Sequence, residues 1–217
     1  WQPLPSMPTA RYSLAAAAVA GTVYAIGGLD TDYKSCEAVE AYDPVSSAWT
    51  LVASLPVARS SHTATVVGGK IYVLGGLQPN PDDENRLIET DRVDVYDPAA
   101  DSWQQVAAMP TARRSHSASV LDGKIYVTGG GLLSREYTDA LEVYDPAADT
   151  WTTLASLGQS RAYHASAAVK GKLCVFGGEL LDGSRTNLVE VYSPAASSWA
   201  RAADVPAAIH QSAAVAL

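Results

Sequence analysis

The chain has 217 residues, of which 47% are apolar and 18% are charged, a composition that suits a compact globular protein and argues against disorder. Its formal net charge of −8 argues against a nucleic acid or an anionic membrane as partner, because both require concentrated Lys and Arg. No apolar run approaches the length of a membrane span, since the longest stretch of small residues, from Leu14 to Val19, is soon broken by Gly21.

A repeat of about 48 residues runs through the chain. Tryptophan stands at positions 1, 49, 103, 151 and 199, and other landmarks keep step with it. They are the glycine pairs at 27–28, 75–76, 129–130 and 177–178, a Tyr seven residues before each later Trp, a Pro between that Tyr and the Trp, and an Arg ten residues after the first four Trp. A repeat of this period indicates a solenoid or a propeller.

Each copy is predicted to contain four strands. The first is built of small residues and covers, in the four copies, Ala15–Val19, Thr63–Val67, Ser117–Leu121 and Ala165–Val169. A two-residue turn ending in Gly leads to an apolar second strand that runs into the glycine pair. A third strand of alternating residues and a turn containing Pro then precede the Trp strand. Short antiparallel strands without a helical pattern predict propeller blades, with small residues innermost and aromatic residues further out, where blades diverge.

One long motif carries a family resemblance. Met-Pro-x-x-Arg, Gly-Lys-Ile-Tyr-Val-x-Gly-Gly, Val-x-Val-Tyr-Asp-Pro and Trp follow one another, most completely from Met109 to Trp151, and the motif resembles the Kelch repeat. The resemblance implies an all-β Kelch-type β-propeller over residues 1–217, with four full blades at approximately 11–55, 59–109, 113–157 and 161–205. Residues 1–8 and 206–217 are expected to supply partial blade strands. The chain would then be an excerpt of a larger propeller, or a small or open ring whose edge a partner covers.

The repeated arginines have two interpretations. They fall in loops between the last strand of one blade and the first strand of the next, and the resemblance implies that this face of a propeller binds partner peptides. Alternatively, a residue repeated in every blade, as Arg11 and its counterparts are, serves the repeat itself. The candidate binding residues in these loops are Arg59, Ser61, Arg113, Arg114, Arg161 and Tyr163. The glycine pairs, by contrast, are interpreted as backbone geometry that a Cβ would block.

The loops after the glycine pairs differ completely from copy to copy, and variation on a repeated scaffold is where specificity is expected. They cover residues 29–36, 77–91, 131–138 and 179–187. The second is longer by six residues and acidic, so it is predicted either to grip a basic partner or to be a solvated insertion. The candidate binding residues in the four loops are Tyr33, Asp82, Asp83, Glu84, Arg86, Arg135, Tyr137 and Arg185.

We expect a protein–protein interaction scaffold with no cofactor, serving as a substrate adaptor or as a subunit of a larger assembly. The alternative is a propeller enzyme of the oxidase or sugar-epimerase type. One repeat position holds a histidine in three copies, at His62, His116 and His164, and a ring of these side chains near the axis could bind a metal. A structural role at the start of the inner strand is the favoured interpretation. The two cysteines, Cys36 and Cys174, are too few and too far apart for a disulfide framework, which favours a reducing compartment, the cytoplasm.

Overall fold

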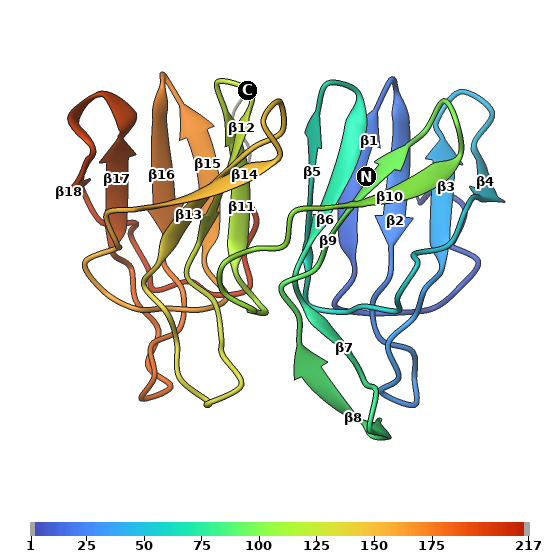
Figure 1. Ribbon diagram of the computed structural model, residues 1–217, viewed down its shortest axis with the longest axis horizontal. Coiled ribbons are helices and arrows are strands. Elements are labelled where there is room, and N and C mark those ends of the chain that lie inside the picture. The colour runs from blue at the N-terminus through green and yellow to red at the C-terminus, as the bar shows by residue number, and fades with distance from the viewer. Residues whose placement is uncertain (1–2, 215–217) are drawn as a thin grey trace. The chain divides into compact units, whose positions relative to one another are not determined.

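The computed structural model describes residues 3–214, apart from the side chain of Glu84. The chain divides into two compact units, Trp1–Ala108 and Met109–Leu217. Each unit contains two four-stranded antiparallel sheets in which neighbouring strands are hydrogen-bonded (Figure 1). The predicted all-β class with four-stranded antiparallel blades is therefore confirmed.

The first unit holds the sheets of copies one and two. The first sheet is ordered β1 (Ala15–Val19), β2 (Thr22–Ile26), β3 (Val39–Asp43) and β4 (Ala48–Leu51). The second sheet contains β5 (Thr63–Val67), β6 (Lys70–Leu74), β9 (Val93–Asp97) and β10 (Ser102–Val106). Between β6 and β9, the strands β7 (Leu77–Asn80) and β8 (Asp83–Glu89) form a separate two-stranded hairpin.

The second unit repeats the plan without a hairpin insertion. One sheet contains β11 (Ser117–Leu121), β12 (Lys124–Thr128), β13 (Leu141–Asp145) and β14 (Thr150–Leu154). The other contains β15 (Ala165–Val169), β16 (Lys172–Phe176), β17 (Val189–Ser193) and β18 (Ser198–Arg201), with the 3-10 turn η1 (Pro194–Ala196) before β18. The four first strands have the bounds that the sequence predicts. In the described part of the chain, no helix has the length and apolar character needed to cross a membrane.

The expected partial strands at the chain ends fall partly on residues 1–2 and 215–217, which lie outside the described residues. The described residues 3–8 and 206–214 run without a strand.

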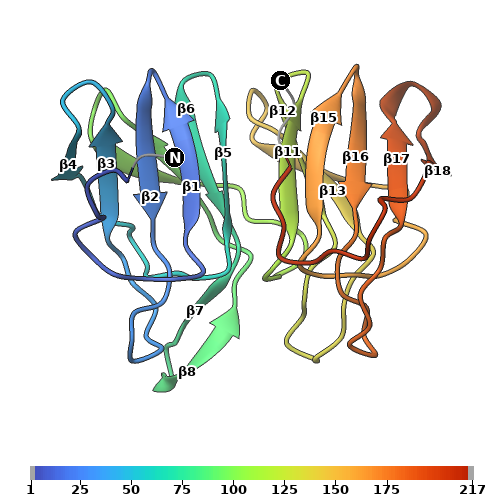
Figure 2. The ribbon, with the colours of Figure 1, turned by 180° about the vertical axis from the view of Figure 1, so that it is seen from behind.

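The hairpin of β7 and β8 corrects the expectation of a loop at residues 77–91. Leu77 pairs with Glu89 and Gln78 with Ile88, and the register shifts between Pro79 and Asn80. In both views the hairpin extends past the ends of its unit's four-stranded sheets, at the same end as the loop between β2 and β3 (Figures 1 and 2). The insertion is therefore an ordered projection from the first unit.

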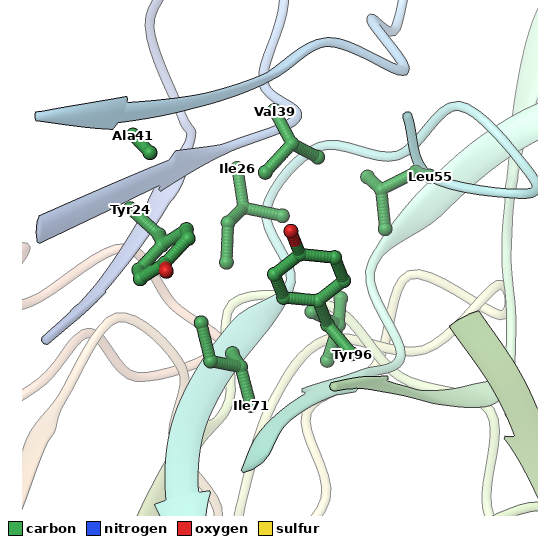
Figure 3. Close-up of a cluster of buried hydrophobic side chains, with 8 residues drawn as sticks. Tyr24, Ile26, Val39, Ala41, Leu55, Ile71 and Tyr96 are labelled. Carbon is green, nitrogen blue, oxygen red and sulfur yellow. The ribbon is translucent and has the colours of Figure 1, made fainter. Parts of the chain in front are cut away.

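Within each unit, the hydrophobic core is packed between neighbouring sheets. In the first unit Tyr24 and Ile26 from β2 pack with Ile71 from β6 and Tyr96 from β9 (Figure 3). The rings of Tyr24 and Tyr96 lie 5.7 Å apart, centroid to centroid. The small-residue strands of one unit also meet each other, since β1 contacts β5 and β11 contacts β15. Close approach of these strands explains why they carry Ala, Ser, Thr and Val.

The recurring Tyr and Trp have a common structural role. Tyr96 and Trp103 are direct cross-strand neighbours on β9 and β10, and their ring centroids lie 5.0 Å apart. The indole Nε1 of Trp103 donates a hydrogen bond of 2.8 Å to the carbonyl of Ala53, on the preceding copy. This hydrogen bond links the outer strand that carries Trp103 to the neighbouring blade.

The glycine pairs are explained by backbone geometry, as predicted. Gly27 has a φ of +59°, and a Cβ at this position would lie 2.5 Å from the carbonyl oxygen of Arg59. Gly129 repeats the arrangement, with φ +56° and a Cβ contact of 2.5 Å to the carbonyl oxygen of Arg161. Such contacts leave no room for a side chain where the blades approach.

Candidate functional site

The repeated arginines are internal. The side chains of Arg59, Arg113 and Arg161 are fully buried, and they form ion pairs with Asp94, Glu142 and Glu190, respectively. Arg11 pairs in the same way with Glu40, Nη1 to Oε2, at 3.0 Å. Of the two interpretations, the structural role in the repeat is therefore the correct one for Arg59, Arg113 and Arg161, and their assignment to a partner-binding surface is wrong, because a buried guanidinium that is already paired offers no atom to a partner.

Two of these arginines, Arg113 and Arg161, position the variable loops of the second unit instead. Arg113 Nη1 donates hydrogen bonds to the carbonyls of Gly129, at 2.9 Å, and Ala140, at 3.3 Å. Arg161 Nη1 does the same to Gly177, at 3.1 Å, and Leu188, at 3.5 Å. Each pair of carbonyls lies at the two ends of one variable loop, so one guanidinium clamps both ends of the loop.

A signal for this burial was present in the sequence. An acidic residue stands nine residues before each of the four later Trp, at positions 40, 94, 142 and 190. It recurs as regularly as the Arg, and a cation and an anion that recur together in every copy indicate an internal pair.

The second copy departs from this pattern. Its acid is the shorter Asp94, which also binds Arg92, Nε to Oδ2 at 2.7 Å and Nη2 to Oδ1 at 2.8 Å. In the third copy the longer Glu142 accepts a 2.6 Å hydrogen bond from the Thr111 hydroxyl, whereas the second copy has Val57 at that position. Burial, together with the charge of Arg92, lowers the pKa of Arg59 to about 10 against the opposing effect of Asp94.

The recurring histidines are buried at the start of the inner strands. His164 Nε2 and the Thr128 hydroxyl lie 2.9 Å apart. Burial, together with the charge of the neighbouring Arg59 or Arg161, lowers the pKa of His62 and of His164 to about 3. Both rings are therefore neutral at physiological pH. Among the described residues, no group of three or more His, Cys, Asp or Glu is arranged to hold a metal ion.

Three of the four variable loops share one backbone turn. The bridges Leu29 to Ser35, Gly131 to Tyr137 and Glu179 to Arg185 close the three loops at equivalent positions. In each loop one residue of the tip has a positive φ: 61° at Tyr33, 63° at Arg135 and 80° at Gly183. The sequences differ, but the scaffold that presents them is the same.

In the second unit, the structure brings four polar side chains close together on the loops. Arg114 Nη1 donates a 3.2 Å hydrogen bond to the Tyr163 hydroxyl, and Tyr163 adopts a φ of 56°. The Tyr137 hydroxyl donates a 2.7 Å hydrogen bond to Glu179 Oε1. Burial raises the pKa of Tyr137 to about 12, with further contributions from Glu179 and the nearby Tyr163. Of the four, only Glu179 was not predicted, although it opens one of the variable loops.

In the first unit, a groove lies between the loop after β2 and the hairpin. Its volume is about 480 Å³, and it is lined by Asp32, Tyr33, Lys34, Ser35, Pro79, Asn85 and Leu87. Tyr33 is 75% exposed and Tyr12, beside it, is 43% exposed. Their rings meet edge to face, with centroids 6.1 Å apart. Of these residues only Tyr33 was predicted, because the sequence alone does not show that the insertion folds back against the first loop.

The remaining candidates are distributed over the loops. Asp82, Asp83 and Arg86 are exposed on the hairpin outside the groove lining, and the side chain of Glu84 lies outside the described part. Arg135 and Arg185 are exposed on their own loops. Ser61 is partly exposed, and its backbone N–H donates a 2.9 Å hydrogen bond to the carbonyl of Ser13.

Comparison with known proteins gives matches along most of the chain. The family model described as "KLHDC2/KLHL20/DRC7 Kelch-repeats domain" matches residues 2–178, and "Kelch motif" matches residues 160–206. Kelch-like protein 35 of Mus musculus is 32% identical over 130 residues, covering 60% of this chain and 21% of the relative. Alpha-scruin of Limulus polyphemus is 29% identical over 134 residues, covering 60% of this chain and 15% of the relative. The chain thus matches about a fifth or less of each relative's length.

A solved structure shares the fold. "Structure of YjhT" superimposes with a TM-score of 0.81 and 23% sequence identity, covering 94% of this chain and 68% of that chain.

Proposed function

Because this chain belongs to the Kelch-repeat family, we propose that it is a protein–protein interaction scaffold that holds a partner through the variable loops of its blades. The proposal includes a cytoplasmic location, for which the two free cysteines are the support. We further propose that the chain acts as a substrate adaptor or as a subunit of a larger assembly. The proposal assigns it no catalytic role.

The shared turn of the variable loops carries the proposal. Tyr33, Arg135 and Gly183 occupy one backbone position on three blades, yet they present an aromatic ring, a cation and no side chain at all. In the two loops of the second unit, Arg113 and Arg161 hold the loop ends without using any exposed atom. A rigid frame with variable, exposed tips is the arrangement by which repeat scaffolds achieve specificity.

Affinity capture with cross-linking and mass spectrometry tests the proposal. We expect a variant with Tyr33→Ala, Arg135→Ala and Arg185→Ala to lose the partner that the unaltered chain retains, and its affinity for the purified partner to fall at least about tenfold. The matched control carries Gln104→Ala, Thr152→Ala and Arg201→Ala, which are exposed on the outer strands. Equal retention of the partner by both variants would contradict the proposal, as would stoichiometric copper or zinc in the purified protein.

A further inference from the structure

The groove of the first unit is a site that the repeat alone does not provide. One wall is the loop after β2, whose counterparts occur on two blades of the second unit. The other wall is the hairpin of β7 and β8, which contributes Pro79, Asn85 and Leu87. A volume of about 480 Å³ is in the range of pockets that bury a small ligand or a few side chains of a peptide.

The aromatic part of the groove is preformed. The Asp30 carboxylate accepts hydrogen bonds of 2.9 Å from the backbone N–H groups of Asp32 and Lys34, which fixes the turn. Tyr33 stands on this turn with a φ of 61°, which is uncommon for a bulky residue, and its ring is largely exposed. The Tyr12 ring packs against it in a T-shaped contact, with the two ring planes at 84°. An exposed tyrosine face held in place is an attractive surface for a cation.

The charge around the groove favours a basic ligand. The lining itself carries one acid, Asp32, and one base, Lys34. The loop and the hairpin together carry two cations, Lys34 and Arg86, against the carboxylates of Asp30, Asp32, Asp82, Asp83, Glu84 and Glu89. None of the described residues donates a hydrogen bond to the carboxylates of Asp32 and Asp82. The net charge of −8 on the whole chain adds a field that attracts cations over a longer range.

We propose that this groove binds a basic segment of a protein partner, with an arginine or lysine side chain lying on the face of Tyr33 and paired with Asp32. Pro79 and Leu87 would cover the aliphatic part of that side chain, and Asn85 would hydrogen-bond the segment's backbone. The inference rests on the proposed function, because it specifies one partner chemistry for one of the variable loops.

Fluorescence anisotropy with labelled peptides of equal length tests this inference. The probes are hexa-arginine, hexa-glutamate and an alternating Gly-Ser peptide, each titrated with the intact chain at physiological salt. We expect hexa-arginine to bind at least about tenfold more tightly than the other two, with Tyr33→Ala and Asp32→Asn each weakening it about fivefold. Tyr33→Phe keeps the aromatic face and should bind as the unaltered chain does.

Asp182→Asn is the matched control, because Asp182 occupies the position of Asp32 in the equivalent loop of another blade and its replacement removes the same charge. Equal weakening by Asp182→Asn and Asp32→Asn would show general charge attraction and overturn the groove site. Absence of hexa-arginine binding, or preference for hexa-glutamate, would overturn the basic ligand. These outcomes leave the proposed function standing if the loop variants still lose the captured partner, so the two failures are distinguishable.

Discussion

At the scale of single residues, Arg113 is a charged side chain that is fully buried. Its guanidinium pairs with Glu142, Nη2 to Oε1, at 2.8 Å, and ties two loop ends together. Removing one member of a buried pair leaves the other charge without compensation. We expect Arg113→Ala to lower the free energy of unfolding by about 3–5 kcal/mol, measured by urea denaturation.

The adjacent Arg114 supplies the control for that experiment. It is only partly buried, so Arg114→Ala should lower the free energy of unfolding by less than about 1 kcal/mol. If the two variants were equally stable, the internal clamp would not contribute to the fold as described.

Two glycines with the same φ separate the cost of a positive φ from the cost of a steric clash. Gly27 and Gly68 both have a φ of +59°, but a Cβ would meet the Arg59 carbonyl oxygen at 2.5 Å in the first case and nothing within 4 Å in the second. We expect Gly68→Ala to cost about 1 kcal/mol and Gly27→Ala at least about 2 kcal/mol more, measured by thermal unfolding. Similar losses would mean that the close approach of the blades tolerates a methyl group.

The residue scale also shows how far the sequence could be interpreted. The role of the glycine pairs was predictable, because two adjacent Gly at one position of every copy indicate a backbone that has no room for a Cβ. For Arg59, Arg113 and Arg161 a structural role and a binding role were both open, and the acid that pairs with each was not identified, because it lies 29–35 residues away from its Arg. Contacts over such separations depend on how the sheets pack, which a strand pattern does not specify.

At the scale of elements, the hairpin of β7 and β8 is an addition to one blade. The blade's own strands β6 and β9 pair directly with each other, from Ile71 with Tyr96 to Leu74 with Val93. We therefore expect that replacing residues 78–89 with a short turn leaves the unfolding temperature within about 3 °C, since few core contacts are lost. The same variant should lose hexa-arginine binding, measured by anisotropy.

A matched replacement clarifies the result. Shortening the equivalent loop of the third copy, residues 132–136, should leave hexa-arginine binding intact. Retained binding in the variant without the hairpin would show that the loop after β2 suffices on its own.

The strands themselves were largely predictable, and the hairpin was not. Strands β1, β5, β11 and β15 begin and end where small residues and a Gly-containing turn indicate, because the same signal occurs in four copies. The insertion occurs once, so no second copy distinguishes its structural residues from its variable ones. Its polar sequence from Asp83 to Glu89 does not show by itself which face meets the groove.

At the scale of the whole molecule, buried histidines link stability to pH. The pKa of His62 and of His164 is about 3 in the folded chain, against an ordinary value of 6.5. Between pH 6.5 and pH 3 these two histidines are therefore protonated in the unfolded chain and neutral in the folded chain. Stability is fully present above pH 6.5 and falls as the pH drops from 6.5 toward 3, by about 1.4 kcal/mol per pH unit for each histidine.

Urea denaturation between pH 7 and about pH 5 measures this slope, because most carboxylates stay charged there. We expect His164→Gln to reduce the slope by roughly the share of one histidine. An unaltered slope in the His164→Gln protein would refute the link.

The arginine clamp has a further consequence for how such a chain can change over generations. Arg113 hydrogen-bonds the backbone carbonyls of Gly129 and Ala140, and a backbone carbonyl remains in place whatever side chain the residue carries. Mutations at the tip, between those two anchors, can therefore accumulate without propagating into the sheet. The sheets and their arginines can therefore be conserved while the residues at the loop tips change. Copies of one ancestral blade can acquire different binding partners without a change of fold.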